Sequence, residues 1–154
     1  NLKAPLVFTP HPGEMARLMD ISTAKVQADR LDVALACARK YRAYTVLKGS
    51  RTIVATPDDQ IYINLRGNSG LATAGSGDVL AGVIGSFLAQ GLSPLRACVC
   101  GVYLHSLAGD LAAENLDEYS LIASDLISYF PQGFRKILAS NNCNTQFQNL
   151  VRIY

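Results

Sequence analysis

Residues Arg66–Gly82 have the sequence RGNSGLATAGSGDVLAG, which is the strongest feature of the chain. Four glycines fall between Gly67 and Asp78, immediately before an apolar pattern that predicts a helix over residues 78–90. Glycine lets the backbone approach a ligand closely and adopt positive φ. The first turn of a helix leaves N–H groups unpaired beside a partial positive charge. A glycine-rich loop that leads into a helix N-terminus therefore predicts a phosphate site.

The carboxylate of Asp78 is the unusual member of this segment. The segment is not a P-loop, because no Lys-Ser/Thr pair follows its last glycine, and Leu80 interrupts a dinucleotide fingerprint. An acid in the first helical turn suits the helix dipole and can be a plain N-cap. Beside a phosphate, however, a carboxylate repels the anion unless it handles a proton or a metal. Both roles stay open, and general acid or base catalysis is the sharper hypothesis.

Strands alternate with helices on both sides of this segment, which indicates an α/β fold. The final helix is expected to bend near Pro131, and Ser22 is a plausible N-cap for the longest early helix. We expect strands over residues 5–9, 44–47, 52–55 and 60–64, the last two forming a hairpin around Pro57-Asp58-Asp59. We expect the other helices over residues 13–20, 24–38 and 121–138, with one more beginning at Ser93-Pro94.

Two further segments carry residues suited to ligand binding. Thr9–Glu14 (TPHPGE) follows a strand, and ligands of open α/β sheets bind beyond the carboxyl ends of strands. A loop histidine such as His11 is more often plain surface, however, and Glu14 can simply start a helix. Lys48–Thr52 (KGSRT) offers two cations, hydroxyls and a glycine, which can hold phosphate or ribose or form an ordinary β-turn.

Composition excludes several other classes of protein. The chain has 154 residues, a length for one domain. Its net charge of +2, with no basic run, argues against nucleic-acid binding. The apolar stretch 95–113 contains charged residues and predicts no membrane span, and His105 within it is expected to be a satisfied core histidine. The four cysteines are Cys37, Cys98, Cys100 and Cys143. We expect them to be buried free thiols, which favours a soluble cytoplasmic protein.

Three of these segments, taken in order, resemble one known family. TPHPGEMARL, LKGSRT and GNSGLATAGSGDVLAGVIGSFLAQGLSP are similar to the signatures of the ADP/ATP-dependent NAD(P)H-hydrate dehydratases, over residues 5–138. The resemblance implies a ribokinase-like α/β fold with a mostly parallel sheet flanked by helices. Residues 1–139 would form the C-terminal portion of that domain, and residues 140–154 a loosely ordered polar tail.

The resemblance also implies a reaction and a set of roles. Members of the family restore NAD(P)H from its S-form hydrate and couple this to phosphoryl transfer from ADP or ATP, with Mg²⁺. By resemblance, His11 and Asp78 would contact the hydrated substrate, Asp78 would handle the proton, and Glu14 would hold magnesium through water. The nucleotide would bind Lys48, Gly49, Ser50, Arg51, Thr52 and Gly77, with Gly75, Ser76 and Gly77 forming an anion hole.

The sequence departs from the family in one large respect and leaves alternatives open. Family members carry an N-terminal half of the domain, so this chain is expected to be a fragment or to be completed by another polypeptide. They are often homo-oligomers, and some carry a fused epimerase domain. A vitamin-precursor kinase of the same superfamily and an inactive nucleotide-binding module are the alternatives. The form HPGEMARL favours ADP over ATP as the donor.

Overall fold

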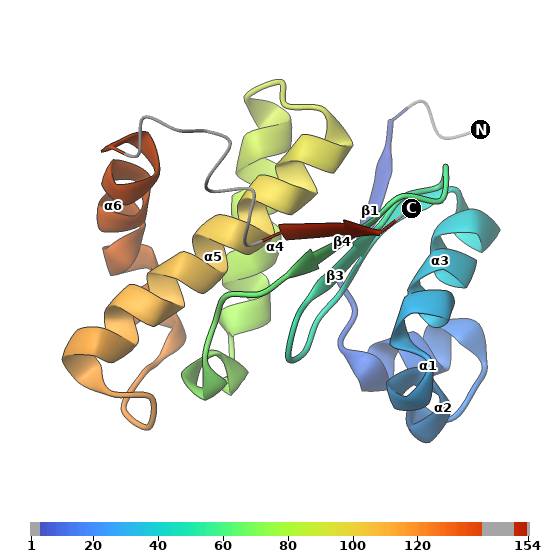
Figure 1. The fold of residues 1–154 in the computed structure, drawn as a ribbon, viewed down its shortest axis with the longest axis horizontal. Helices are drawn as coiled ribbons and strands as arrows, with labels where there is room; N and C mark the ends of the chain where they lie inside the picture. The colour runs from blue at the N-terminus through green and yellow to red at the C-terminus, as the bar shows by residue number, and fades with distance from the viewer. Residues whose placement is uncertain (1–3, 140–149, 154) are drawn as a thin grey trace. The chain divides into compact units, whose positions relative to one another are not determined.

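The computed structural model describes residues 4–139 and, as a strand, residues 150–153. The chain divides into two compact units. The first comprises Asn1–Ile63 with Arg152–Tyr154, and the second comprises Asn64–Val151. Figure 1 shows the elements of both, and each unit is described by itself below.

The first unit is built on a mixed sheet. Strand β1 (Leu6–Phe8) pairs in parallel with β2 (Ala43–Leu47), whereas β3 (Ile53–Ala55) pairs antiparallel with β2 and with β4 (Ile61–Asn64). The strand order is β1-β2-β3-β4-β5, with β5 at Leu150–Ile153. The expected mostly parallel sheet is therefore wrong for the described strands. The predicted hairpin is confirmed, and its short turn can join only antiparallel neighbours.

Three helices cover one face of this sheet: α1 (Pro12–Met19), α2 (Thr23–Ala28) and α3 (Arg30–Tyr41) (Figure 1). The single helix predicted over 24–38 is wrong, because the chain breaks at Asp29, with φ −129° and ψ 48°. Aspartate is a weak helix former, and its carboxylate here pairs with the Lys25 ammonium of the preceding turn. The core between helices and sheet contains Met15, Val26, Val33, Ala34, Cys37, Leu47, Ile53 and Ile61.

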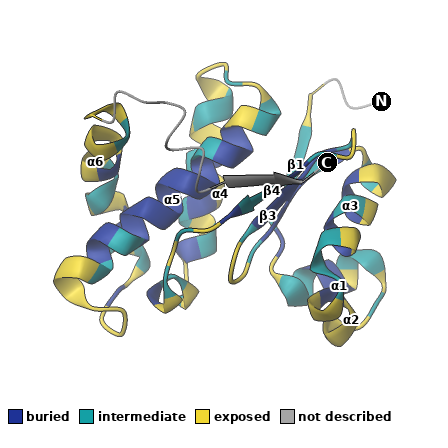
Figure 2. Cartoon of the chain, in the orientation of Figure 1, coloured by how far each residue is buried: buried dark blue, intermediate teal, exposed yellow. Residues whose placement is uncertain are grey.

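The second unit is helical. Its elements are the 3₁₀ helix η1 (Ser69–Ala72), α4 (Ser76–Ala89), α5 (Pro94–Leu116) and α6 (Ala123–Ala139). Helix α5 is the central one, buried without interruption over residues 101–109, as the dark blue ribbon of Figure 2 shows. Glycines allow the close packing. A Cβ added to Gly101 would lie 2.7 Å from Ile84 of α4, and one added to Gly133 of α6 would lie 3.0 Å from Leu104.

Several predicted boundaries are confirmed. The side chains of Ser22 and Ser93 cap α2 and α5, and Gly91 has a φ of +87° between α4 and α5. Helix α4, by contrast, begins two residues before its predicted start. Pro131 lies inside α6, at an exposed position. Residues 140–149 and 154 of the predicted polar tail lie outside the described residues, so its loose ordering stays a prediction.

Two further expectations concern membrane and thiols. Among the described residues, no helix has both the length and the apolar character needed to cross a bilayer. Cys37, Cys98 and Cys100 are free thiols, as predicted, and Cys143 lies outside the described residues. Burial raises the pKa of the Cys98 thiol to about 12, so this side chain stays protonated.

Candidate functional site

His11 follows strand β1 after Thr9 and Pro10, and its side chain caps helix α1. Its Nδ1 accepts hydrogen bonds from the amides of Gly13, at 3.0 Å, and Glu14, at 3.3 Å. The Glu14 carboxylate accepts in return from the His11 amide at 2.6 Å, which completes a capping box. Because Nδ1 is an acceptor, the neutral ring carries its proton on Nε2. The imidazole is thus fixed at its base while about half of the side chain remains exposed.

Lys48 reaches the same place from the neighbouring strand. Strands β1 and β2 run in parallel, so their carboxyl ends meet at one edge, and the Lys48 amide donates to Pro10 O at 2.8 Å. The Lys48 ammonium lies 3.6 Å from the Glu14 carboxylate. Partial burial by itself would raise the pKa of Glu14, but the His11 amide and the charges of Lys48 and His11 outweigh it and lower that pKa. Glu14 therefore sits, ionised, between His11 and Lys48.

The turn after β2 is shaped by an arginine that sequence reasoning missed. Gly49 and Arg51 have φ values of +136° and +57°, and Thr52 Oγ1 donates to Gly49 O at 3.3 Å. The Arg30 guanidinium donates to Leu47 O and Arg51 O at 3.5 and 3.4 Å. A Cβ on Gly49 would lie 2.5 Å from that guanidinium. The turn therefore needs glycine at this position for its φ, whereas the Arg30 guanidinium ends a flexible side chain that could move aside.

The glycine-rich segment forms the N-terminus of α4 in the second unit. Gly75 has a φ of +84° and occupies the N-cap, and its carbonyl accepts from the amides of Asp78 and Val79 at 3.0 and 3.1 Å. Among residues 4–139 the Gly77 amide has no hydrogen-bond acceptor, as expected for the first turn of a helix. Asp78 is exposed in that same turn. The Ser76 amide donates to Thr73 O at 3.3 Å, and the anion hole stays a prediction.

His105 of α5 holds the start of α4 in place. Its Nε2 lies 3.2 Å from Ser76 Oγ and 3.0 Å from Ser76 O, and both residues are buried. The prediction of a satisfied core histidine is confirmed. The same contact explains why α4 starts at Ser76, two residues earlier than apolar spacing predicts.

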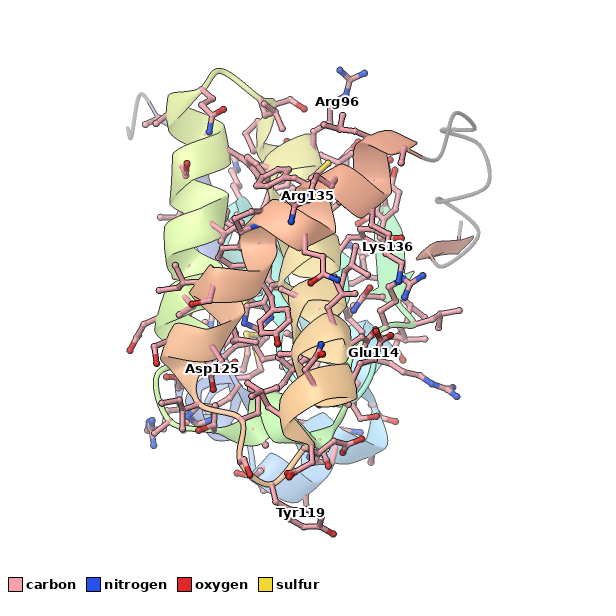
Figure 3. The ribbon with its side chains drawn as sticks, turned by 90° about the vertical axis from the view of Figure 1, so that its left-hand side faces the viewer. Arg96, Glu114, Tyr119, Asp125, Arg135 and Lys136 are labelled. Atoms are coloured by element: carbon pink, nitrogen blue, oxygen red, sulfur yellow. The ribbon has the colours of Figure 1, made fainter. Side chains whose placement is uncertain are left out.

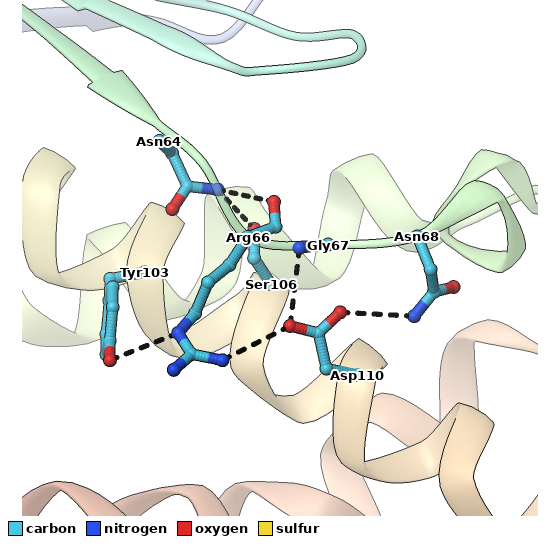
Figure 4. Close-up of polar contacts among 7 residues, drawn as sticks. All are labelled: Asn64, Arg66, Gly67, Asn68, Tyr103, Ser106 and Asp110. Atoms are coloured by element: carbon cyan, nitrogen blue, oxygen red, sulfur yellow. Dashed lines mark hydrogen bonds and ion pairs between the residues drawn. The ribbon is translucent and has the colours of Figure 1, made fainter. Parts of the chain in front are cut away.

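A second polar contact of α5 was not predicted as functional. Asp110 faces three donors on the connection that leads from β4 to η1, namely Arg66, Gly67 and Asn68 (Figure 4). Arg66 also donates from Nε to the Tyr103 hydroxyl at 3.2 Å and lies over that ring. The available signal was the single acid within the apolar stretch 95–113, since a partly buried acid needs donors.

The structure thus groups the predicted site residues within each unit. His11, Glu14 and the Lys48–Thr52 turn gather at one edge of the sheet in the first unit, and Gly75–Asp78 form a helix N-terminus in the second. The assignment of individual ligands to these residues stays a prediction.

Comparison with known proteins defines the class first. The chain shares its fold with a ribokinase-like superfamily protein of Enterococcus faecalis V583, with a TM-score of 0.75 and 33% identity over 88% of this chain and 46% of that one. The ADP/ATP-dependent NAD(P)H-hydrate dehydratase of Bacillus subtilis, co-crystallised with ATP/Mg²⁺ and soaked with CoA, gives a TM-score of 0.85 and 32% identity over 88% of this chain and 50% of that one.

The family follows from the sequence comparison. Residues 1–132 match the model of the NAD(P)H-hydrate dehydratase family, so the chain belongs to it. It is 51% identical to the bifunctional NAD(P)H-hydrate repair enzyme of Moorella thermoacetica, over 86% of this chain and 25% of that protein. It is also 51% identical to the ADP-dependent (S)-NAD(P)H-hydrate dehydratase of Neisseria meningitidis, over 71% of this chain and 37% of that one. The chain therefore spans a quarter to a half of these relatives.

Proposed function

We propose that this chain catalyses the ADP- or ATP-dependent dehydration of the S form of hydrated NAD(P)H. The reaction restores NAD(P)H and releases AMP or ADP together with phosphate. The observation that carries the proposal is the N-terminus of α4, where the Gly77 amide, without an acceptor among residues 4–139, lies beside the exposed carboxylate of Asp78. An anion site next to a potential base suits transfer of a phosphoryl group to a hydroxyl. Membership of the dehydratase family supports the choice of substrate.

The proposed chemistry turns a poor leaving group into a good one. Asp78 takes the proton of the substrate hydroxyl while the hydroxyl oxygen forms a bond to the terminal phosphorus of the nucleotide. The bond from that phosphorus to the departing AMP or ADP breaks, and the backbone amides of Gly75–Gly77 stabilise the negative charge. Cleavage of the carbon–oxygen bond then expels phosphate, and loss of a proton from the adjacent carbon restores the ring double bond.

In the first unit, the proposed roles are binding ones. The Lys48–Thr52 turn holds the nucleotide, with the Lys48 ammonium and the Arg51 guanidinium opposite its phosphates. His11, whose side chain is half exposed and whose Nε2 lies 3.6 Å from Glu14 Oε1, donates from Nε2–H to the hydrated nicotinamide. Glu14 keeps Lys48 in place through their 3.6 Å ion pair and holds the His11 backbone amide.

Magnesium fits this residue set only in company with a nucleotide. No group of three or more His, Cys, Asp or Glu side chains that could hold a metal occurs within residues 4–139, so these residues build no cage of their own. A Mg²⁺ ion commonly keeps several waters and binds one or two carboxylates together with substrate phosphates. Glu14 is the carboxylate we propose to approach it through water. When bound, the ion neutralises charge on the phosphates.

The proposal extends to partners and compartment. Relatives are two to four times longer than the matched part, so we propose that the other half of the domain completes the active enzyme, in the same polypeptide or as another chain. We further propose a homo-oligomer. The free thiols of the described cysteines suit the cytoplasm, where thiols stay reduced.

The kinase alternative has weaker support. Hydroxyethylthiazole kinase of Pyrococcus horikoshii shares the fold with a TM-score of 0.72, but at 16% identity this likeness concerns the fold alone. A kinase would leave a stable phosphorylated product, whereas the proposed reaction restores the absorbance of reduced nicotinamide. An inactive module would bind nucleotide without turnover.

The test is an absorbance assay at about 340 nm, the wavelength of reduced nicotinamide. The full chain is mixed with S-form hydrated NADH, magnesium and either ADP or ATP, with and without the remaining half of the domain from a relative. We expect a rise that depends on the nucleotide, and the effective nucleotide identifies the donor. No rise in any of these mixtures would overturn the proposal.

A matched pair of variants tests the role of Asp78. Asp78→Asn is expected to lower kcat by at least about 100-fold, the usual contribution of a general base. Asp32→Asn changes an acid in the first turn of α3 and is expected to leave turnover unchanged. Wild-type turnover in a correctly folded Asp78→Asn chain would remove Asp78 from the mechanism.

A further inference from the structure

Both oxygens of the Asp110 carboxylate contact the segment that precedes the glycine-rich turn. Oδ2 accepts from the Gly67 amide at 3.4 Å and lies 3.5 Å from Arg66 Nη1, and Oδ1 accepts from Asn68 Nδ2 at 3.3 Å. Figure 4 shows the three donors converging on this one side chain of α5. One turn earlier on the helix, Ser106 Oγ accepts from Asn64 at 2.8 Å.

Gly67 and Asn68, which Asp110 contacts, determine the conformation of the chain as it enters η1. Gly67 has a φ of +106°, and a Cβ there would lie 2.9 Å from Leu71 Cδ1, so the backbone has no room to shift toward that side chain. Asn68 Oδ1 accepts from the Gly70 amide at 3.0 Å and thereby caps η1. Leu71 in η1 packs back on α5, because a Cβ on Gly109 would lie 2.6 Å from Leu71 Cδ2. The η1 helix is thus attached at its start by Asn68, and also by Ser69, whose amide donates to Glu118 at 3.1 Å.

The far end of the same segment is held by the same helix. His105 of α5 contacts Ser76, the first residue of α4, through two short distances of 3.2 and 3.0 Å. Residues 67–76 are thus attached to α5 at both ends, by Asp110 at the entry and by His105 at the exit. The segment between the two attachments contains Gly75 and ends beside Gly77 and Asp78.

We propose that Asp110 is a positioning residue: it fixes Gly67 and Asn68 on α5 and so sets the geometry of the glycine-rich turn that presents Gly75–Asp78. The inference rests on the proposed function for its catalytic consequence, but its structural consequence is independent of it. Asp110 acts through the backbone and needs no contact with either substrate.

A carboxylate is required because Arg66, Gly67 and Asn68 all face Asp110 with donors. An ionised carboxylate accepts at both oxygens and donates nothing. The substitution Asp110→Asn would keep the shape of the side chain but would turn an N–H group toward either Asn68 or the Gly67 and Arg66 pair. One donor would then face another donor, and the entry of the segment would lose part of its attachment.

The experiment compares Asp110→Asn with Glu114→Gln. Glu114 is an exposed acid one turn further along α5, labelled in Figure 3, and serves as the matched control. The first readout is amide hydrogen exchange of the full chain without ligands. In Asp110→Asn we expect exchange of the Gly67, Gly70 and Leu71 amides to accelerate at least about tenfold, with the centre of α5 unchanged. In Glu114→Gln all of these rates are expected to match wild type.

The second readout is steady-state turnover in the hydrated NADH assay. Because Asp110 acts on Gly75–Asp78, which we propose to act on the transferring phosphoryl group, and contacts no residue of the Lys48–Thr52 turn that we propose to hold the nucleotide, we expect kcat to fall about tenfold or more and the KM for the nucleotide to change less than kcat. A rise in nucleotide KM with unchanged kcat would overturn the positioning role. So would unchanged exchange and unchanged kcat.

A milder variant covers the case in which Asp110→Asn fails to fold. Asn68→Ser keeps an oxygen that caps η1 but lacks the amide group whose Nδ2 donates to Asp110, and its hydroxyl sits on a shorter side chain. It is expected to accelerate exchange at Gly67 and Leu71 to a smaller extent. Unchanged exchange in Asn68→Ser would count against the inference. If the wild-type chain shows no turnover in any mixture, the proposed function fails, and the exchange measurement still decides whether Asp110 orders this segment.

Discussion

The Glu14 carboxylate shows at the scale of a single residue how one side chain serves two strands. It accepts a hydrogen bond from the His11 amide, shortly after β1, and forms an ion pair with the Lys48 ammonium, directly after β2. Glutamine at this position keeps an oxygen for the amide but loses the ion pair. Because the side chain is 43% exposed, we expect Glu14→Gln to destabilise the chain at pH 7 by no more than about 1 kcal/mol.

The lowered pKa of Glu14 determines how the destabilisation by Glu14→Gln changes with pH. The pKa of Glu14 is lowered in the folded chain from an ordinary value of 4.5, so its stabilising effect is present above that value and is lost as the pH falls through the lower folded pKa. Urea unfolding of wild type and Glu14→Gln should differ at pH 7, and the difference should shrink as the pH falls below 4.5 and the carboxyl becomes protonated in the folded chain as well. A difference that stays the same at pH 7 and at acidic pH would contradict the assignment.

At the scale of elements, the packing of α4 on α5 depends on one glycine. A Cβ on Gly101 of α5 would lie 2.7 Å from Ile84 Cγ1, closer than side chains tolerate. We expect Gly101→Ala to destabilise the chain by about 1–3 kcal/mol through overpacking. Gly82 of α4 has no atom within 4 Å of such a Cβ, so Gly82→Ala should be neutral or stabilising by up to about 1 kcal/mol. Thermal melts of both variants test this pair, and equal melting temperatures would contradict it.

The elements differ in how far sequence reasoning could predict them. The hairpin around Pro57-Asp58-Asp59 was predictable because two β-type runs flank a short turn. The break at Asp29 was not, since the apolar spacing continues through it on both sides, and only the pairing of its carboxylate with Lys25 marks the turn. A mostly parallel sheet was expected from the family resemblance, yet the turn at Lys48–Thr52 and the hairpin that follows it make the β2–β3 and β3–β4 pairings antiparallel.

The candidate site was predictable where it rests on local chemistry. Gly75–Asp78 form the expected helix N-terminus, whereas His11, expected in a loop, caps α1. The contacts of Arg30 with the turn after β2, and of Asp110 with Gly67, join residues 21 and 43 positions apart. No periodicity or composition reports such pairs, because they depend on how helices pack against distant loops.

At the scale of the whole molecule, α6 carries apolar side chains that the second unit does not bury. Ile127, Phe134 and Leu138 are 56%, 42% and 77% exposed, and their spacing of seven and four residues places them on one side of the helix. Phe134 extends this apolar surface to α4 through an edge-on contact with Phe87 at 6.3 Å. Asp125 and the pair Arg135 and Lys136 mark the two ends of α6 in Figure 3. A surface of this kind indicates association with another polypeptide.

We therefore predict that charges on this stripe weaken self-association of the chain. The double variant Ile127→Lys with Leu138→Lys should sediment as smaller species than wild type at the same concentration, because each lysine desolvates at a cost in an apolar contact. Ser128→Lys adds a charge to an exposed position of the same helix about 100° away and should sediment like wild type. If wild type is already monomeric at all concentrations, or the double variant associates equally well, α6 is not the associating surface, and the homo-oligomer proposed above would have to form elsewhere.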